Sequence, residues 1–155
     1  LERDGGLYAG VVYEPISDQM FWAEKGRGAH LNSTRLRVSS RCSMDEAIFA
    51  TGIPFIGRED HEVFLAELKR VMAVSAGVRR FGSAALDLAY VAAGRFEGFW
   101  EKGLNSWDVA AGIVLVREAG GMVSDFSGRG RMIENSEVIA TNSEIHNELR
   151  SFIKG

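Results

Sequence analysis

Residues 47–153 alternate between strand-like and helix-like segments, and this alternation limits the possible folds more than any other feature of the sequence. Short apolar runs between turn residues indicate strands, whereas apolar residues spaced three or four apart indicate helices. Four successive strand-to-helix repeats favour a layered α/β domain with a mainly parallel sheet. The expected strands are 47–55, 77–82, 95–101, 122–126 and 137–142, and the expected helices are 60–74, 83–94, 108–121 and 144–153.

The first part of the chain has a different pattern, which indicates an antiparallel meander up to about Val38. Strands are expected at 7–15 and 19–24, and Asn32-Ser33 indicates a tight turn between two further short strands. A polar, turn-rich segment follows the meander and marks a soft boundary. This boundary divides the chain into residues 1–44 and residues 45–155.

The composition is that of a soluble globular protein and argues against several classes of function. Hydrophobic residues make up 46% and charged residues 25%, which are ordinary values. The net charge of -3, without a run of lysine or arginine, argues against nucleic-acid binding. The longest apolar run is shorter than the roughly 20 residues of a membrane-spanning helix. Cys42 is the only cysteine, so an intramolecular disulfide is impossible and a reducing, cytoplasmic location is expected.

Polar residues and small residues follow two of the expected strands, where a parallel sheet binds its ligands. The turn Gly82-Ser83-Ala84 leads directly into a helix, and its free backbone N–H groups can donate to a ligand oxygen. A second loop runs from Glu101, at the end of a strand, to Asp108, at the start of a helix. Because ligands bind beyond the carboxyl ends of such strands, we expect both loops on one rim of the sheet.

Each of these residues also has a structural interpretation. Asp108 and Ser83 are residues of the type that caps a helix N-terminus, a role that contributes about 1 kcal/mol. Glu101 follows the apolar pair Phe99-Trp100, so its carboxylate needs a partner or a water-filled cleft. Two neighbours of Asp108 are expected to be structural: a core aromatic residue at Trp107, and a glycine that packs closely on the sheet at Gly112.

Other familiar sites are absent from the sequence. The three histidines, His30, His61 and His146, have no zinc-ligand spacing. A G-x-S-x-G nucleophile elbow does not occur, and the glycine-rich segments do not match a phosphate-binding P-loop. The sequence therefore directs attention to the two strand-to-helix loops.

Taken together, these motifs resemble the inositol monophosphatase family. The segment WDVAAGIVLVREAGG, 107–121, resembles the family's C-terminal signature, and GSAALDLAYVAAGRFEGFWEKGL, 82–104, resembles a segment on its substrate side. The stretches GVVYEP, KGRGAHLN and ATGIPF match in pattern and order, and the overall pattern is closest to the bacterial SuhB branch. The resemblance implies a layered αβαβα sandwich. Residues 1–44 would be strands from the N-terminal sheet of a truncated domain, and residues 45–155 a C-terminal α/β domain.

Roles for individual residues follow from the resemblance. It implies that Asp108 is catalytic and helps to bind one of the catalytic Mg²⁺ ions, whose preference for carboxylate oxygens agrees with this role. Glu101 would accept a hydrogen bond from an inositol hydroxyl. The turn Gly82, Ser83 and Ala84 would touch the inositol hydroxyls, and Arg79 would lie near the substrate and a subunit contact. The implied reaction is metal-assisted hydrolysis of a phosphate monoester by water.

Two of the family's metal motifs, a Glu-Glu pair and D-P-[IL]-D-G-T, occur nowhere in this sequence. In the family both precede the segment that corresponds to Leu7. The chain also opens without methionine, and only three residues precede the hairpin-turn signal Asp4-Gly5. We therefore expect roughly 100 further residues upstream. We also expect residues 1–155 alone to have negligible phosphatase activity.

The substrate and the partners remain open at this level. The EKGL and GSAALD segments favour an inositol phosphate over the nucleotide bisphosphates, histidinol phosphate or fructose bisphosphate of related enzymes. The resemblance also implies a homodimer. A second hypothesis, from the SuhB branch, is a regulatory protein that binds RNA polymerase or antitermination factors, although the acidic charge disfavours direct RNA binding. A membrane partner is not expected.

Overall fold

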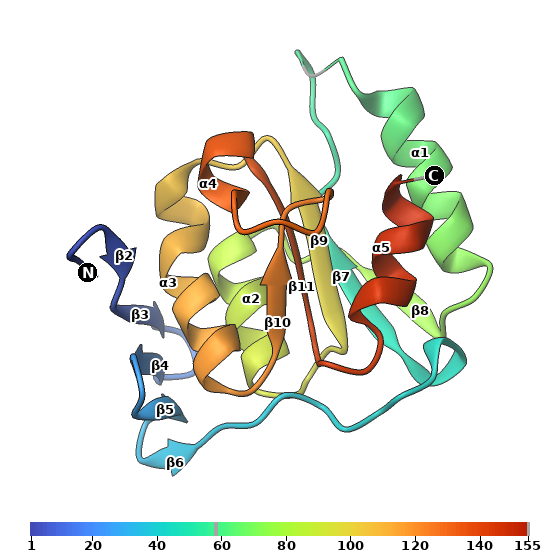
Figure 1. The fold of residues 1–155 in the computed structure, drawn as a ribbon. Helices are drawn as coiled ribbons and strands as arrows, with labels where there is room; N and C mark the ends of the chain where they lie inside the picture. Colours follow the sequence, from blue (N-terminus) through green and yellow to red (C-terminus); the bar gives the residue numbers. More distant parts are fainter. Residues whose placement is uncertain (58, 155) are drawn as a thin grey trace.

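A computed structural model describes residues 1–57 and 59–154, which fold into stacked layers of sheet and helix (Figure 1). In chain order the described elements are β1 (Glu2–Arg3), β2 (Gly6–Leu7), β3 (Ala9–Glu14), β4 (Gln19–Glu24), β5 (Gly28–Leu31), β6 (Thr34–Arg35), the 3₁₀ turn η1 (Met44–Glu46), β7 (Ile48–Thr51), α1 (His61–Met72), β8 (Gly77–Arg79), α2 (Ala84–Ala92), β9 (Gly98–Lys102), α3 (Ser106–Glu118), β10 (Met122–Ser124), α4 (Met132–Asn135), β11 (Glu137–Thr141) and α5 (His146–Lys154). None of the described helices is long and apolar enough to cross a membrane.

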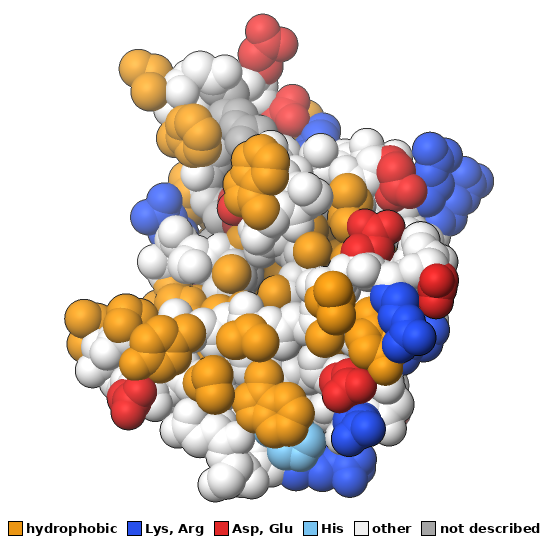
Figure 2. Space-filling view, turned by 90° about the vertical axis from the view of Figure 1, so that its left-hand side faces the viewer, with side chains coloured by type: hydrophobic (Ala, Val, Ile, Leu, Met, Phe, Trp, Pro, Cys, Tyr) orange, Lys and Arg blue, Asp and Glu red, His pale blue; other side chains and the backbone are white. Residues whose placement is uncertain are grey.

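The predicted meander is present as the antiparallel sheet β3-β4-β5-β6. Its strands have one buried and one exposed face, because successive side chains of a strand point to opposite sides. Val12 and Phe21 are buried, whereas Val11, Tyr13 and Met20 are exposed. Figure 2 shows hydrophobic side chains gathered on the side of the molecule where this sheet lies.

The second sheet has the order β10-β11-β9-β7-β8. β7 pairs in parallel with β8 and with β9, but β11 is antiparallel to both β9 and β10. Of the described strands in this sheet, β7, β8, β9 and β10 therefore run in one direction and β11 runs against them, so the sheet is mixed but mainly parallel, as expected. Between β10 and β11 the only described helix is the four-residue α4, and parallel neighbours usually need a crossover with a full helix.

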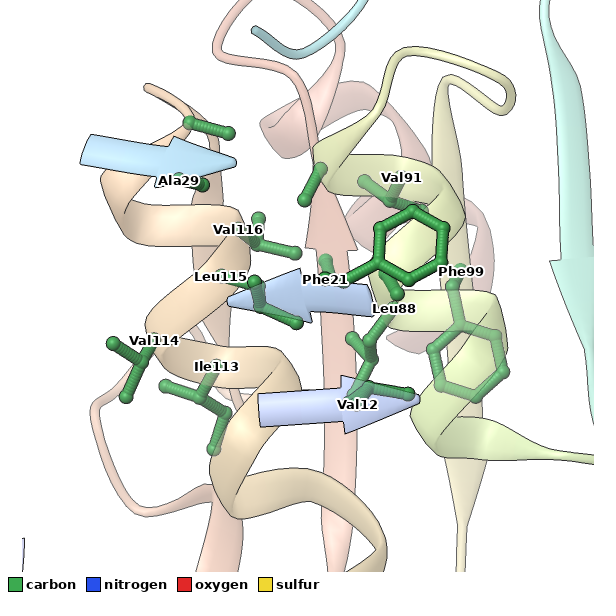
Figure 3. Close-up of a cluster of buried hydrophobic side chains, with 14 of the residues drawn as sticks. Val12, Phe21, Ala29, Leu88, Val91, Phe99, Ile113, Val114, Leu115 and Val116 are labelled. Carbon is green, nitrogen blue, oxygen red and sulfur yellow. The ribbon is translucent and has the colours of Figure 1, made fainter. Parts of the chain in front are cut away.

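Helices α2 and α3 lie between the two sheets, and α1 and α5 cover the far face of the five-stranded sheet (Figure 1). The described residues thus form four layers in the order sheet, helices, sheet, helices, which confirms the layered α/β class. One apolar core joins the meander to α2, α3 and the second sheet (Figure 3). Its labelled members are Val12, Phe21, Ala29, Leu88, Val91, Phe99, Ile113, Val114, Leu115 and Val116. The division at residue 44 remains a prediction.

Two glycines allow backbones to approach closely around α3. A Cβ on Gly112 would lie 2.5 Å from the Cβ of Leu88, so this glycine packs against helix α2. The expectation that Gly112 packs on the sheet is therefore wrong. A Cβ on Gly10 of β3 would lie 2.7 Å from the Cα of Ala111. These contacts fix α3 against α2 and against the meander, and thereby fix the position of its first turn.

Candidate functional site

The carboxyl ends of β7, β8 and β9 meet at one edge of the five-stranded sheet, because these three strands run in parallel. Each strand is followed by a loop: 52–57 and 59–60, as far as described, after β7, 80–83 after β8 and 103–105 after β9. β7 ends at Thr51, earlier than the predicted strand 47–55, so Ile53 and Phe55 belong to a loop and are exposed. This edge is the rim of the sheet on which both polar loops were expected from the sequence.

A cavity of about 430 Å³ lies between these loops, within the range of small-molecule sites. Five of the six residues selected from the sequence line it: Gly82, Ser83, Ala84, Glu101 and Asp108. They come from the end of β9 and from the N-terminal ends of α2 and α3. The fold therefore brings together residues that lie up to 26 positions apart in the chain, from Gly82 to Asp108.

Glu101 is half-buried, and its carboxyl group rests against the backbone of Gly52. A Cβ at position 52 would lie 2.0 Å from Cδ of Glu101, so any larger residue at this position would displace the carboxyl group. Sequence analysis did not select Gly52. A signal was available, because a glycine at the end of a buried strand often marks a close approach of another group.

Ser83 has both of the roles considered for it. Its Oγ accepts a hydrogen bond of 3.5 Å from the N–H of Leu86, so it is the N-cap of α2, and it also lines the cavity. Gly82 precedes it with φ of +88°, a conformation that favours glycine. The predicted cap of α2 is thus confirmed.

Asp108 lies within the first turn of α3 and is not its N-cap, which corrects the structural interpretation. Asn105 is the N-cap, and Oδ2 of Asp108 accepts a hydrogen bond of 2.9 Å from its N–H. This is the reciprocal side of a capping-box arrangement, and it explains why the helix begins two residues before the predicted start. Within the described part of the chain, Oδ1 of Asp108 has no hydrogen-bond partner, and the half-buried side chain lines the cavity.

Trp107 was expected in the core but is 77% exposed, so this expectation is wrong. With the helix start at Ser106, Trp107 is the second helical residue and lies at the cavity. The core side of α3 is occupied by residues such as Val109 and Ile113.

Arg79 is the one selected residue that does not line the cavity. It is exposed at the end of β8, where its Nη1 donates a hydrogen bond of 3.0 Å to the carbonyl of Val78. Its neighbour Arg80 lines the cavity instead. Adjacent residues of an extended chain point in opposite directions, so at most one of the two arginines is expected to face the site.

Asp87 is a further carboxyl group near the cavity that the sequence analysis missed. It lies in the first turn of α2, is 1% exposed and makes no side-chain hydrogen bond within the described residues. Burial, and then the charge of Glu101, raise the pKa of Asp87 to about 7, while Arg80 acts in the opposite direction. The available signal was an aspartate within the apolar helical segment 84–92.

The described residues fit one position of a metal site but not a complete one. They contain no group of three or more His, Cys, Asp or Glu residues that could hold a metal ion. Asp108 nevertheless lines the cavity with a carboxylate oxygen that makes no hydrogen bond to the other described residues. Mg²⁺ is commonly held by one or two carboxylates together with water and phosphate oxygens. Asp108 is thus suited to be one ligand among several.

Comparison with known proteins gives consistent matches along the chain. The profile of the inositol monophosphatase family matches residues 1–153. A protein of Mesorhizobium japonicum named inositol-1-monophosphatase is 51% identical over 99% of this chain and 58% of its own length. The Nus factor SuhB of Pseudomonas aeruginosa is 45% identical over 97% of this chain and 56% of its own length.

A solved structure agrees with the fold in detail. The crystal structure of the extragenic suppressor protein suhB from Bartonella henselae matches with a TM-score of 0.96 and 49% identity, and the match covers 99% of this chain and 58% of that one. The chain therefore spans somewhat more than half of the length of the relatives that it matches.

Proposed function

The chain belongs to the inositol monophosphatase family, and from this membership we propose that the protein containing it hydrolyses inositol monophosphate, with the cavity beyond β7, β8 and β9 as the polyol side of its active site. The observation that carries the proposal is the convergence of Gly82, Ser83, Ala84, Glu101 and Asp108 on one cavity of about 430 Å³.

Glu101 is the residue proposed to recognise the polyol. An ionised carboxylate accepts hydrogen bonds only, and the hydroxyl groups of a sugar alcohol donate them. The contact with Gly52 holds the carboxyl group at the cavity. The turn Gly82-Ser83-Ala84 supplies small side chains and a helix N-terminus, which favours close approach of hydroxyl or phosphate oxygens.

Asp108 is proposed to hold Mg²⁺ through the oxygen that the helix does not use. When bound, Mg²⁺ neutralises charge on the phosphate and makes water a better nucleophile. The capping bond to Asn105 fixes the Asp108 side chain in one orientation, so its ligand oxygen is preorganised. A homodimer is proposed from the resemblance, which places Arg79, an exposed residue, near a subunit contact. A cytoplasmic location is proposed as well.

A comparison of two substrates tests the function in the intact gene product. We expect Mg²⁺-dependent release of phosphate from inositol monophosphate. Glu101→Gln should raise KM for inositol monophosphate about tenfold, the value of one lost charge-assisted hydrogen bond. The same variant should leave hydrolysis of phenyl phosphate, which has no hydroxyl groups, unchanged. Equal losses on both substrates, or a preference for another phosphate ester, would refute the polyol assignment.

A regulatory role is a second proposal, and it rests on the relatives named Nus factor SuhB, such as the one from Pseudomonas aeruginosa with 45% identity. It requires that binding to RNA polymerase or antitermination factors does not depend on hydrolysis. A pull-down with the Asp108→Asn variant separates the two functions. Binding that survives loss of hydrolysis supports a second role, and no binding by the wild-type protein removes it.

A further inference from the structure

A cationic side chain of the cavity lining, Arg80, has no role in the proposed binding of the polyol or of Mg²⁺. It follows β8, in the loop 80–83, and among the described residues that line the cavity it is the only one with a positive charge. The other charged residues of this lining are the acids Glu101 and Asp108. Without a cation beside them, these two carboxylates would repel an anionic substrate.

The guanidinium group of Arg80 lies against Gly82, in the turn that leads into α2. A Cβ at Gly82 would lie 3.2 Å from Nη1 and 3.5 Å from Cζ of Arg80. Gly82 and the next residue, Ser83, line the cavity as well. The contact therefore places the charged end of Arg80 at the cavity wall.

The charge of Arg80 has no partner within the described residues. Its side chain forms no ion pair with an acid there, and its guanidinium nitrogens donate no hydrogen bond to those residues. Other arginines of the chain do have partners, since Arg41 pairs with Glu97 at 2.8 Å and Arg95 donates to Gln19 at 2.6 Å. The N–H groups of Arg80 are therefore available to a ligand.

We propose that Arg80 is a substrate-binding residue that donates hydrogen bonds to the phosphate oxygens of the phosphate monoester. The inference rests on the proposed function, because it takes the cavity as part of a phosphatase site. A guanidinium group is planar and always charged, and two of its N–H groups match two oxygens of a phosphate group. The resemblance places an arginine near the substrate at Arg79, but the geometry points to its neighbour.

Kinetics of the intact gene product on two substrates test this role. Inositol monophosphate and phenyl phosphate both carry a phosphate group, so Arg80→Gln should raise KM about tenfold for each of them. Glu101→Gln, in contrast, should affect inositol monophosphate alone. Arg80→Lys keeps the charge without the planar pair of donors, so we expect a smaller rise in KM. The matched control is Arg37→Gln, because Arg37 is exposed and lies outside the cavity lining, and its kinetics should equal those of the wild type.

Three results would overturn the proposal. An unchanged KM for phenyl phosphate in Arg80→Gln would show that Arg80 does not contact the phosphate group. An equal rise in KM in Arg37→Gln would show that only the net charge of the protein matters. A rise in Arg79→Gln without one in Arg80→Gln would assign the role to Arg79. Circular dichroism of each variant controls for folding.

A binding measurement separates this inference from the proposed function. Titration of the intact gene product with inorganic phosphate at saturating Mg²⁺, followed by phosphorus NMR, requires no hydrolysis. We expect Kd for phosphate to be about tenfold higher in Arg80→Gln than in the wild type and in Arg37→Gln. This result without hydrolysis of inositol monophosphate would refute the proposed function and support the role of Arg80. Equal Kd values would overturn the role of Arg80 even if hydrolysis is observed.

Discussion

Gly52 and Glu101, at the carboxyl ends of neighbouring parallel strands, are so close that a Cβ at position 52 would lie 2.0 Å from Cδ of Glu101. Glycine at this position therefore creates the space that the Glu101 carboxyl group occupies. The contact joins a residue without a side chain to the acid that is proposed to bind the polyol. It makes the position of Glu101 testable without changing Glu101 itself.

Replacement of Gly52 by alanine should move Glu101 while preserving the fold. The atoms that a new methyl group would meet belong to the end of a flexible side chain, so we expect the free energy of unfolding to fall by only about 1 kcal/mol, the low end of the cost of an added methyl group. KM for inositol monophosphate should rise at least about tenfold. Gly130→Ala is the matched control, because a Cβ at Gly130 meets nothing within 4 Å. Unchanged kinetics in Gly52→Ala would show that the orientation of Glu101 is unimportant.

Replacement of Asp108 by asparagine should abolish turnover with little effect on folding. Asparagine can still accept the N–H of Asn105, so we expect a loss of stability of only about 0.5 kcal/mol from the weaker interaction with the helix dipole. Loss of a carboxylate ligand should lower kcat at least about 100-fold and weaken Mg²⁺ binding. Glu62→Gln, in the first turn of α1, is the control for the helix dipole. Full activity in Asp108→Asn would exclude the metal role.

Residues 1–155 by themselves should release phosphate from inositol monophosphate at less than about one-hundredth of the rate of the intact gene product. The physical reason is that the described residues contain no cluster of three metal-ligating side chains, and Asp108 alone does not make a Mg²⁺ site. The measurement is phosphate release with and without Mg²⁺, with circular dichroism as a control for folding. Robust Mg²⁺-dependent turnover by this piece would contradict the expectation.

The stability of the intact gene product should depend on pH through Asp87. Because the pKa of Asp87 is raised from 3.8 to about 7, the folded state holds a proton that the unfolded state releases. The resulting loss of folding stability is absent below pH 4, grows between pH 4 and pH 7, and is complete above pH 7. Asp87→Asn should therefore increase the free energy of unfolding at pH 8 by about 2 kcal/mol. This is roughly half of the free energy that corresponds to the whole pKa shift of Asp87, because the buried amide of asparagine also lacks a hydrogen-bond partner and lowers stability.

Urea denaturation at pH 4 and at pH 8 measures this difference. The control is Asp4→Asn, since the Asp4 side chain is 91% exposed and asparagine tolerates its positive φ. We expect the control to have the same stability as the wild type at both pH values. Destabilisation by Asp87→Asn at pH 8 would mean that the carboxylate has a stabilising partner.

Local sequence patterns were sufficient to predict the elements that carry the site. The strand before Glu101, the helix after Ser83 and the helix containing Asp108 have the expected type, with ends shifted by a few residues. Their convergence follows from a general property of parallel strands, whose carboxyl ends share one edge. Proximity could thus be inferred without knowledge of the register.

Features that depend on tertiary contacts could not be predicted in this way. The antiparallel placement of β11 is set by non-local pairing, as between Val138 and Glu101. The exposure of Trp107 depends on which face of α3 meets α2, and the helix start was placed two residues late. Gly52 and Asp87 have local signals, a glycine after a buried strand and an aspartate in an apolar helix. The close approach of Glu101 to Gly52 and the burial of Asp87 depend on tertiary contacts, which these signals do not specify.

A crystal structure of the intact gene product with inositol monophosphate tests the central proposal most directly. We expect the ring in the cavity beyond β7, β8 and β9, with a hydroxyl oxygen about 3 Å from a carboxylate oxygen of Glu101 and the phosphate on the side of Asp108. A ligand bound elsewhere, or a ring whose hydroxyl groups do not reach Glu101, would contradict the proposal.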